Sequence, residues 1–256
     1  MLRVDMKNIT LISGVDFAKP YSGDPAPDPN GPTPFWGMDT SNVAEVEPGV
    51  GVGFIWEIWR SVDGKEEDRG CGMIKVSLEE EMPVANRTGP LITGSDGLQV
   101  GLMTVMNAEG YIYTYSNGGT SPTGMVCGRA KLADAFDARK YEFQKTDGSW
   151  VEGIPKANDT NYGMQGPIHS DEQGSIMWNS YFQKYMLFVG AFGNDMNFYM
   201  SDTPYGPGSE EYGLLHVLGY GVNVHPQWSP GGNDKIIYIS SGWANVITMY
   251  RVVFDD

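Results

Sequence analysis

The sequence predicts an all-β protein, and three observations support this fold class. Its 256 residues include 34 glycines, 16 prolines, 14 tyrosines and 7 tryptophans, a composition typical of many short strands joined by tight turns. The mainly apolar runs, such as KYMLFVGAF and DKIIYIS, are strand-length and fall short of the roughly 20 residues that cross a bilayer. Units of three strands also recur along the chain. Helical character is confined to residues 131–138, a turn or two at most.

The repeat consists of an apolar strand, a turn, an aromatic-rich strand, a polar turn and a third strand. The turns EPGVG, NAEG and PGGND place Gly or Asn where a hairpin requires positive φ. A fourth, outer strand follows the first three copies, as ANRTGPLI, KYEFQKTDGSWV and YGLLHVLG. The four copies occupy residues 41–78, 97–132, 174–202 and 223–254.

This repetition predicts one β-propeller domain over residues 1–256, with four recognisable blades. We expect the strand-like residues 8–14 to supply the outer strand of the last blade, which closes the ring and removes two exposed sheet edges. A β-sandwich with Greek-key connections is the alternative, but it does not predict the three-strand register. The expected blades are approximately 38–93, 94–152, 161–218, and 219–256 together with 8–14.

The charge and the cysteines narrow the classes of partner and site. A net charge of −15 repels phosphate backbones and anionic lipid, so we expect neither nucleic acid nor a membrane as partner. Cys71 and Cys127 fall in the third strands of consecutive blades, too far apart for a disulfide, and are expected to be free, buried thiols. No zinc, calcium or phosphate-loop motif is present, so we expect no metal and no cofactor.

The cellular compartment stays open at this stage. Three glycosylation sequons, at Asn8, Asn86 and Asn158, favour a secreted protein. The first residues, MLRVDMKN, contain no apolar signal core, which leaves the alternative of an intracellular protein.

Several motifs over residues 33–254 resemble the propellers of domain-of-unknown-function family 4185. They are PFWGMDTSNVA, GYIYTYSNG followed by CGRAKLADAFDARKYEF, GSIMWNSYFQKYMLFV, SDTPYGP and the late His225-Pro226. The resemblance implies a five-bladed propeller related to glycoside hydrolases and sialidases, some of which cleave furanosidic polysaccharide; similar fungal propellers act as pericyclases. The chain lacks a counterpart of the family's first blade, whose Gly-Asp-Thr strand is only echoed by Met38-Asp39-Thr40.

The loops that enter each innermost strand, and those that join second to third strands, meet at one end of a propeller, which we call the mouth. This concave end is the default binding site. A glycosidase needs two carboxyl groups on either side of the scissile bond, and Asp39 of the first blade lies opposite Asp171 or Glu172 of the third. His225 is the expected proton or hydrogen-bond donor. The alternative is that each acid caps a turn and that the histidine only lines the channel.

Aromatic, methionine and polar residues of the same loops are the expected ligand contacts. Aromatic faces suit sugars, whereas the 14 methionines suit an adaptable apolar pocket. Three functions are therefore open: binding and possible cleavage of a neutral carbohydrate, a non-hydrolytic cyclase or binder of an apolar metabolite, and a non-catalytic interaction module. Substrate and oligomeric state are not predicted. The expected contacts are Trp36, Met38, Asp96, Tyr162, Met164, His169, Asn223 and Trp243.

Overall fold

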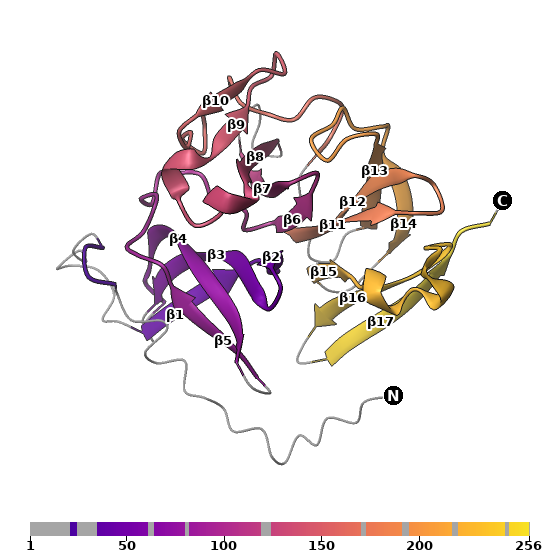
Figure 1. Ribbon diagram of the computed structural model, residues 1–256, viewed down its shortest axis with the longest axis horizontal. Helices are drawn as coiled ribbons and strands as arrows, with labels where there is room; N and C mark the ends of the chain where they lie inside the picture. Colours follow the sequence, from indigo (N-terminus) through magenta and orange to yellow (C-terminus); the bar gives the residue numbers. More distant parts are fainter. Residues whose placement is uncertain are drawn as a thin grey trace.

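The computed structural model is almost entirely β, with four antiparallel sheets arranged around a common axis (Figure 1). This arrangement confirms the all-β class and the four-bladed propeller, and it excludes the sandwich. None of the helical turns in the part of the chain that the structure describes is long and apolar enough to span a bilayer. The structure describes residues 21–24, 35–60, 64–79, 82–118, 124–169, 173–190, 195–216, 220–243 and 246–255.

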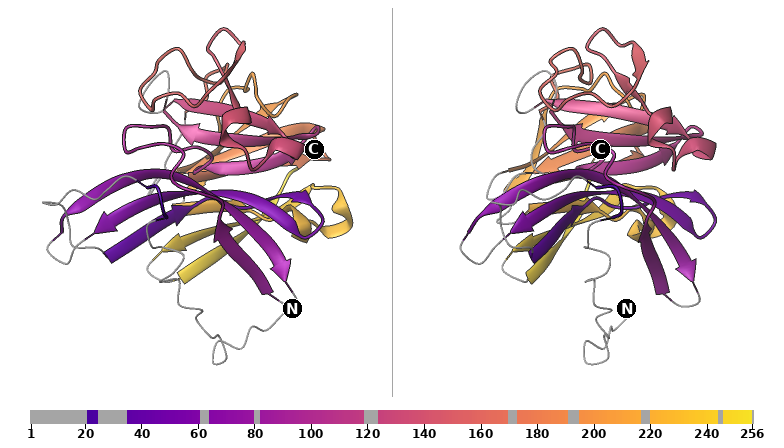
Figure 2. Two further views of the ribbon diagram at one scale, coloured as in Figure 1. Left: turned by 60° about the vertical axis from the view of Figure 1, so that its left-hand side comes forward. Right: turned by 90° about the vertical axis from the view of Figure 1, so that its left-hand side faces the viewer.

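Blade 1 has an interrupted innermost strand. Its two pieces, β1 and β2, both pair with β3, and the sheet continues through β4 to β5. The long strands β3 and β4 twist strongly, as the side views show (Figure 2). The strands are β1 (Phe35–Thr40), β2 (Ala44–Glu47), β3 (Val50–Arg60), β4 (Glu66–Glu79) and β5 (Met82–Arg87).

Blade 2 follows the predicted second copy. Two 3-10 turns, at residues 132–134 and 138–140, stand between its third and fourth strands, where the sequence shows its only helical character. Its strands are β6 (Thr104–Ala108), β7 (Tyr111–Asn117), β8 (Met125–Lys131), β9 (Glu142–Gln144) and β10 (Trp150–Glu152).

Blade 3 has four strands and blade 4 has three among the described residues. The predicted outer strands of blades 1 to 3 are confirmed as β5, β9 with β10, and β14. Residues 8–14, the predicted outer strand of blade 4, lie outside the described residues. The strands of blade 3 are β11 (Gln173–Asn179), β12 (Lys184–Gly190), β13 (Asp195–Ser201) and β14 (Tyr212–His216); those of blade 4 are β15 (Tyr220–Val224), β16 (Ile236–Trp243) and β17 (Val246–Val253).

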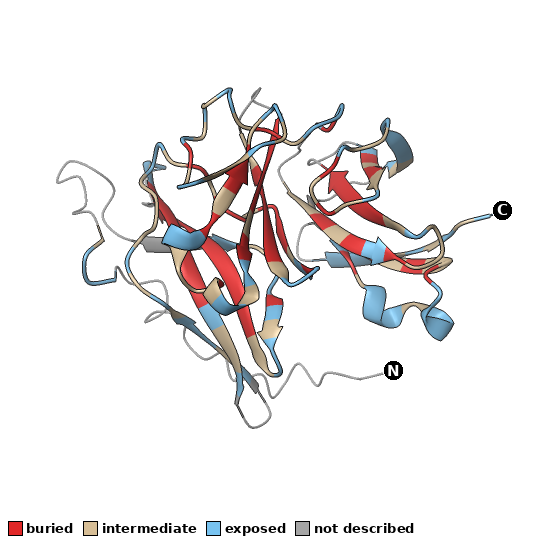
Figure 3. Ribbon diagram, turned by 45° about the horizontal axis from the view of Figure 1, so that its top comes forward, coloured by how far each residue is buried: buried red, intermediate tan, exposed pale blue. Residues whose placement is uncertain are grey.

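The core lies between blades, in three clusters of buried apolar side chains. Alternation along β7 shows the principle: Ile112 faces blade 1, while Tyr113 and Tyr115 face blade 3. Blades 2 and 3 each contribute to two clusters, so their central strands are buried on both faces (Figure 3). No such cluster of described residues joins blade 4 to blade 1, and the ribbon is open there (Figure 1).

Hydrogen bonds join each blade to the next at the same three boundaries. The side-chain amide of Asn42 accepts a hydrogen bond from the backbone N–H of Val105 in blade 2 and donates one to the carbonyl of the same residue. The Tyr115 hydroxyl donates to the carbonyl of Pro204, 2.5 Å away. The Asp234 carboxylate of blade 4 accepts from the backbone N–H and hydroxyl of Ser180. Each bond spans dozens of residues and fixes one blade against its neighbour.

Candidate functional site

A cleft of about 420 Å³ opens at the mouth of the propeller. Its walls come from β1, β3, the start of β4, the loop that enters β6, the end of β7 and the start of β11. Most of these residues belong to segments that the sequence predicts as loops at the mouth, although the structure places several of them in strands. The lining residues are Asp39, Thr40, Trp56, Ile58, Glu66, Asp68, Gln99, Leu102, Asn117 and Gln173.

A second cavity, of about 230 Å³, lies on the axis next to this cleft. The two share Thr40, Leu102 and Gln173, so they form one continuous hollow. All four blades line the axial cavity, with Asn42, Met103, Gly174 and Asn223 among the residues that only it contains. The inner strands that surround this space, β2, β6, β11 and β15, are labelled around the centre of Figure 1.

A β-bulge between β3 and β4 decides which side chains reach the cleft. Glu57 pairs with Gly70, but its neighbour Ile58 pairs with Asp68, so Arg69 is the extra residue. Asp68 therefore stands on the same sheet face as Ile58, toward blade 2. Arg69 turns to the opposite face. Gly70 is required here, because its φ is +139° and a Cβ would lie 2.0 Å from the carbonyl oxygen of Thr93.

Asp39 and Asp68 lie on that same face of blade 1, one on each side of β3. Asp39 pairs with Trp56 and Asp68 pairs with Ile58, so the two acids are offset by two positions. Ordinary strand spacing and rise separate their Cα atoms by about 12 Å. Side chains that lean together across β3 can bring the carboxyl groups into the roughly 6.5–9.5 Å range of inverting glycosidases.

Trp56 holds one member of this pair in place. Its indole N–H donates to Oδ1 of Asp68 over 2.8 Å, and its own side chain is only 3% exposed. A buried donor that points at an exposed carboxylate restricts the rotamer of that carboxylate. Asp68 is thus oriented by the core of blade 1.

Most of the other residues that line the cleft are polar. Glu66 adds a third carboxyl group, and Gln99, Asn117 and Gln173 add amides from blades 2 and 3. Such groups accept and donate hydrogen bonds to hydroxyl-rich ligands, and carboxyl groups transfer protons. In the described part of the chain, no group of three or more His, Cys, Asp or Glu side chains is arranged to hold a metal ion.

The predicted site residues divide between the hollow and other places. Asp39 lines the cleft and Asn223 lines the axial cavity, where it accepts a hydrogen bond from Ser175. Asp171 and Glu172 lie outside the described residues. Trp36 and Met38 on β1, and Trp243 at the end of β16, are described only in their backbone.

Four other predicted ligand contacts lie away from both cavities. Asp96 forms an exposed ion pair with Lys156, which lowers the pKa of Asp96. Tyr162 packs against the core between blades 1 and 2. Met164 packs between blades 2 and 3. The side chain of His169 is exposed, and its backbone N–H donates to the Tyr199 hydroxyl.

His225 also lies away from the cleft. The sequence places it at the start of an inner strand, but β15 spans Tyr220–Val224, so the histidine follows that strand at the end remote from the mouth. There Nε2 forms a 2.9 Å hydrogen bond with the Ser240 hydroxyl, and the ring stacks on Trp228. Burial lowers the pKa of His225. These contacts are those of a structural residue.

Sequence reasoning missed Asp68 and the amides of the cleft. Asp68 belongs to WRSVDGKEEDRG, a loop expected at the mouth that contains several acids. Only the bulge selects among them. The Asp-Arg-Gly order was the available signal, because an isolated glycine in a strand marks a bulge.

Comparison with protein-family models and with curated proteins finds no match for this chain. The resemblance to family 4185 therefore stays a prediction. Among solved structures, a GH43_1 enzyme from Xanthomonas citri is similar with a TM-score of 0.43 and 14% identity, over 84% of this chain and 68% of that chain. A B. megaterium levansucrase variant is similar with a TM-score of 0.39 and 11% identity, over 90% and 89% of the two chains.

A Bacillus subtilis levansucrase in complex with oligosaccharides is also similar, with a TM-score of 0.39 and 9% identity, over 100% of this chain and 88% of that chain. Scores this low carry no argument. The fold therefore rests on the strand pairing of the chain itself, and the function rests on the cleft.

Proposed function

We propose that the protein binds and hydrolyses a neutral carbohydrate in the cleft at its mouth. The observation that carries the proposal is the pair Asp39 and Asp68, which face one cleft from the two strands that flank β3. Amides and a third carboxyl group provide hydrogen bonds for sugar hydroxyls. The net charge of −15 and the three acids in the cleft favour a neutral glycan over a polyanionic one.

The offset of the pair across β3 suggests hydrolysis with inversion, which uses the wider of the two carboxyl separations. Asp68, which the Trp56 N–H orients, accepts a proton from water while the water oxygen bonds to the anomeric carbon. The glycosidic C–O bond breaks as Asp39 donates a proton to the leaving oxygen. Asp68 ends protonated and Asp39 ionised, and exchange with solvent restores both.

The alternative functions have less support in the cleft. An apolar metabolite needs an apolar wall, but seven of the ten lining residues are polar. Met164, expected to contribute to such a wall, is packed between blades instead. A purely structural interaction module needs no pair of carboxyl groups on one sheet face.

The experiment is an assay of a panel of neutral oligosaccharides with the wild type, Asp39→Asn and Asp68→Asn. We expect each substitution to lower kcat by about 10²- to 10⁴-fold, because a positioned acid or base contributes that much. Proton NMR of the first product should show the inverted anomer. Binding of the same sugars, measured by calorimetry, should persist in both variants.

Asp96→Asn is the matched control, because Asp96 is an exposed acid in a mouth loop that does not line the cleft. Its kcat should equal that of the wild type. Unchanged cleavage in both Asp39→Asn and Asp68→Asn would refute the carboxyl pair. Sugar binding without any cleavage by the wild type would reduce the proposal to a carbohydrate-binding protein.

A further inference from the structure

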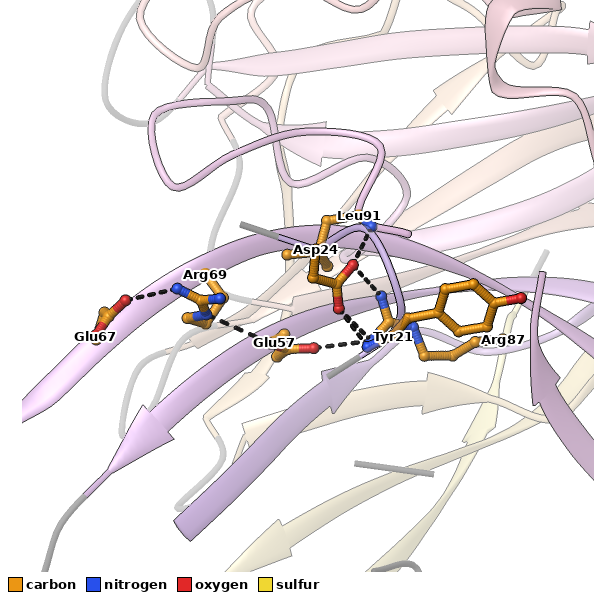
Figure 4. A network of polar contacts seen from close by, with 7 residues as sticks. All are labelled: Tyr21, Asp24, Glu57, Glu67, Arg69, Arg87 and Leu91. Carbon is orange, nitrogen blue, oxygen red and sulfur yellow. Dashed lines mark hydrogen bonds and ion pairs between the residues drawn. The ribbon is translucent and has the colours of Figure 1, made fainter. Parts of the chain in front are cut away.

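Five charged side chains form a chain of ion pairs on the face of blade 1 that is turned away from blade 2 (Figure 4). Four of them are at most 4% exposed. Taking charges out of water is costly, and a buried ion pair is often no more stabilising than an apolar substitute. A network of this kind is better explained by a structure that it specifies than by stability alone. The pairs are Glu67 with Arg69, Arg69 with Glu57, Glu57 with Arg87, and Arg87 with Asp24.

Arg69, the extra residue of the bulge, contacts groups on both strands that form it. Its Nη1 donates to Oε1 of Glu67 over 2.8 Å, and its Nε lies 3.6 Å from Oε1 of Glu57. Its guanidinium carbon stands 4.3 Å from the centre of the Trp59 ring. On β3, Glu57 lies just before the bulge and Trp59 just after it, so these contacts enclose the bulge from both sides.

A register without the bulge would reverse the two faces of this part of β4. Arg69 would take the place of Asp68 opposite Ile58, and Asp68 would move on by one position. Because paired residues of a sheet share a face and successive residues alternate, Arg69 would then point toward the cleft and Asp68 toward the back of the blade. The bulge therefore decides whether an acid or a base stands in this wall of the cleft.

The ion pairs favour the bulged register. In it, the Arg69 guanidinium stands between the carboxylates of Glu57 and Glu67 (Figure 4). Without the bulge, the Asp68 carboxylate would join Glu57 on the buried face in place of that cation, and like charges at short range repel. Gly70 permits the bulge through its positive φ, but it has no side chain that prefers one register.

We propose that Arg69 is a positioning residue for the cleft: its ion pairs with Glu57 and Glu67 lock the bulged register that turns Asp68 into the cleft. Arg69 acts through the backbone of β4 and does not itself line the cleft. The consequence for catalysis rests on the proposed hydrolysis, whereas the register and the orientation of Asp68 do not.

The Trp56 indole N–H, which donates to Asp68, gives a readout that is independent of activity. Its resonance in a ¹H–¹⁵N spectrum is assigned by its loss in Trp56→Phe, and Asp68→Ala gives its position without the hydrogen bond. We expect Arg69→Met to move the resonance to the position seen in Asp68→Ala, because an uncharged side chain no longer favours the bulge. Arg69→Lys keeps a cation within reach of Glu57 and should leave most of the signal at the wild-type position.

Cleavage of an oligosaccharide gives the second readout. Arg69→Met should lower kcat as much as Asp68→Asn does, by about 10²- to 10⁴-fold, while KM stays near the wild-type value. Arg69→Lys should restore most of kcat. A wild type that cleaves no sugar would refute the proposed hydrolysis, and the indole resonance would still decide whether Arg69 positions Asp68.

Arg129→Met is the matched control, because Arg129 is held in a similar way on blade 2 and does not line the cleft. Its Nε lies 2.6 Å from Oε1 of Glu142, and its guanidinium carbon lies 3.9 Å from the centre of the Trp150 ring. The variant should lower the melting temperature but leave the Trp56 resonance and kcat unchanged. Asp24→Asn, at the other end of the network, should do the same.

If Arg69→Met does not fold, Glu67→Gln weakens the same contacts more mildly and should move part of the Trp56 signal. The proposal is overturned if whichever of these variants folds keeps the indole resonance of the wild type, since Gly70 alone would then set the bulge. It is also overturned if Arg129→Met shifts the resonance as far as Arg69→Met does, since the ion pairs would then serve stability only.

Discussion

The role of a residue in this propeller depends on whether its side chain points toward a neighbouring blade or into the hollow at the centre of the ring. Cys71 is fully buried on the face of blade 1 that packs on blade 2, and Cys127 is fully buried between blades 2 and 3. The prediction of two free, buried thiols is thereby confirmed. Neither thiol lines the cleft or the axial cavity, and both belong to the packed clusters between blades.

The thiols should be inert in the folded protein. Burial raises the pKa of Cys71 to about 12, and it also raises the pKa of Cys127. At pH 8 a disulfide reagent such as DTNB should therefore release less than about a tenth of the expected colour until denaturant is added, and then two equivalents.

The raised pKa of Cys71 also makes the stability of the fold depend on pH. A folded pKa above the unfolded value means that the contribution of Cys71 is fully present below the unfolded pKa and is lost as pH rises toward 12. The melting temperature should fall between about pH 9 and 11 more in the wild type than in Cys71→Ala. Equal slopes in the two proteins would contradict the assignment.

The short link between β1 and β2 holds blade 1 against blade 2 through the side chain of Asn42. Asn42 in this link donates to the carbonyl of Val105 at 2.9 Å and accepts from its N–H at 2.8 Å, and it also accepts from the buried Thr104 hydroxyl at 3.0 Å. The Asn42 amide thus makes the two hydrogen bonds that a paired backbone residue would make between two inner strands. It also lines the axial cavity.

Asn42→Ala should destabilise the fold by about 2–4 kcal/mol, since it leaves several polar groups at the interface between blades without a partner. The measurement is chemical denaturation followed by tryptophan fluorescence. Asn107→Ala provides the matched comparison, because Asn107 makes a single exposed bond, to the carbonyl of Glu45, across the same boundary. That change should cost less than about 1 kcal/mol. Similar losses for the two variants would show that Asn42 has no special role.

Across the whole molecule, stability is expected to be uneven, because the blades share their cores unequally. Blades 2 and 3 each contribute to two interblade clusters, whereas blades 1 and 4 each contribute to one. Among the described residues, blade 4 adds four buried side chains to its cluster, against seven from blade 1. A unit with fewer buried contacts opens at lower free energy than the rest. Blade 4 is therefore the part of the ring that opens first.

Hydrogen exchange followed by mass spectrometry tests this order. Peptides from β15 to β17 should exchange at least about tenfold faster than peptides from β7 and β12. A tenfold difference in exchange corresponds to an opening free energy that is lower by about 1.4 kcal/mol. Peptides from β5 and β14, the outer edge strands of blades 1 and 3, serve as internal references for solvent exposure. Slower exchange in blade 4 than in blade 2 would contradict the unequal sharing of the core.

The sequence by itself determined the all-β class, the four three-strand units and the end of the molecule where the cleft opens, because turn residues and period-two alternation are local properties. Asp39 could be chosen in advance, since the sequence predicts it in a segment that enters an inner strand; the structure places it on β1, where it lines the cleft. The tertiary structure alone decided the rest of the site. The bulge at Arg69 turns Asp68 into the cleft, and Trp56 orients it from another strand.

The difference between local pattern and tertiary position also explains why the structure places several predicted site residues away from the cleft. His225 was placed at the wrong end of its strand because the sequence does not mark where β15 begins, and a shift of a few residues carries a side chain from the mouth to the opposite end of the blade. Tyr162 and Met164 have the composition of a binding surface but are packed between blades. Apolar side chains that line a pocket and those that fill an interface have the same local pattern, and only the position of the neighbouring blade separates them.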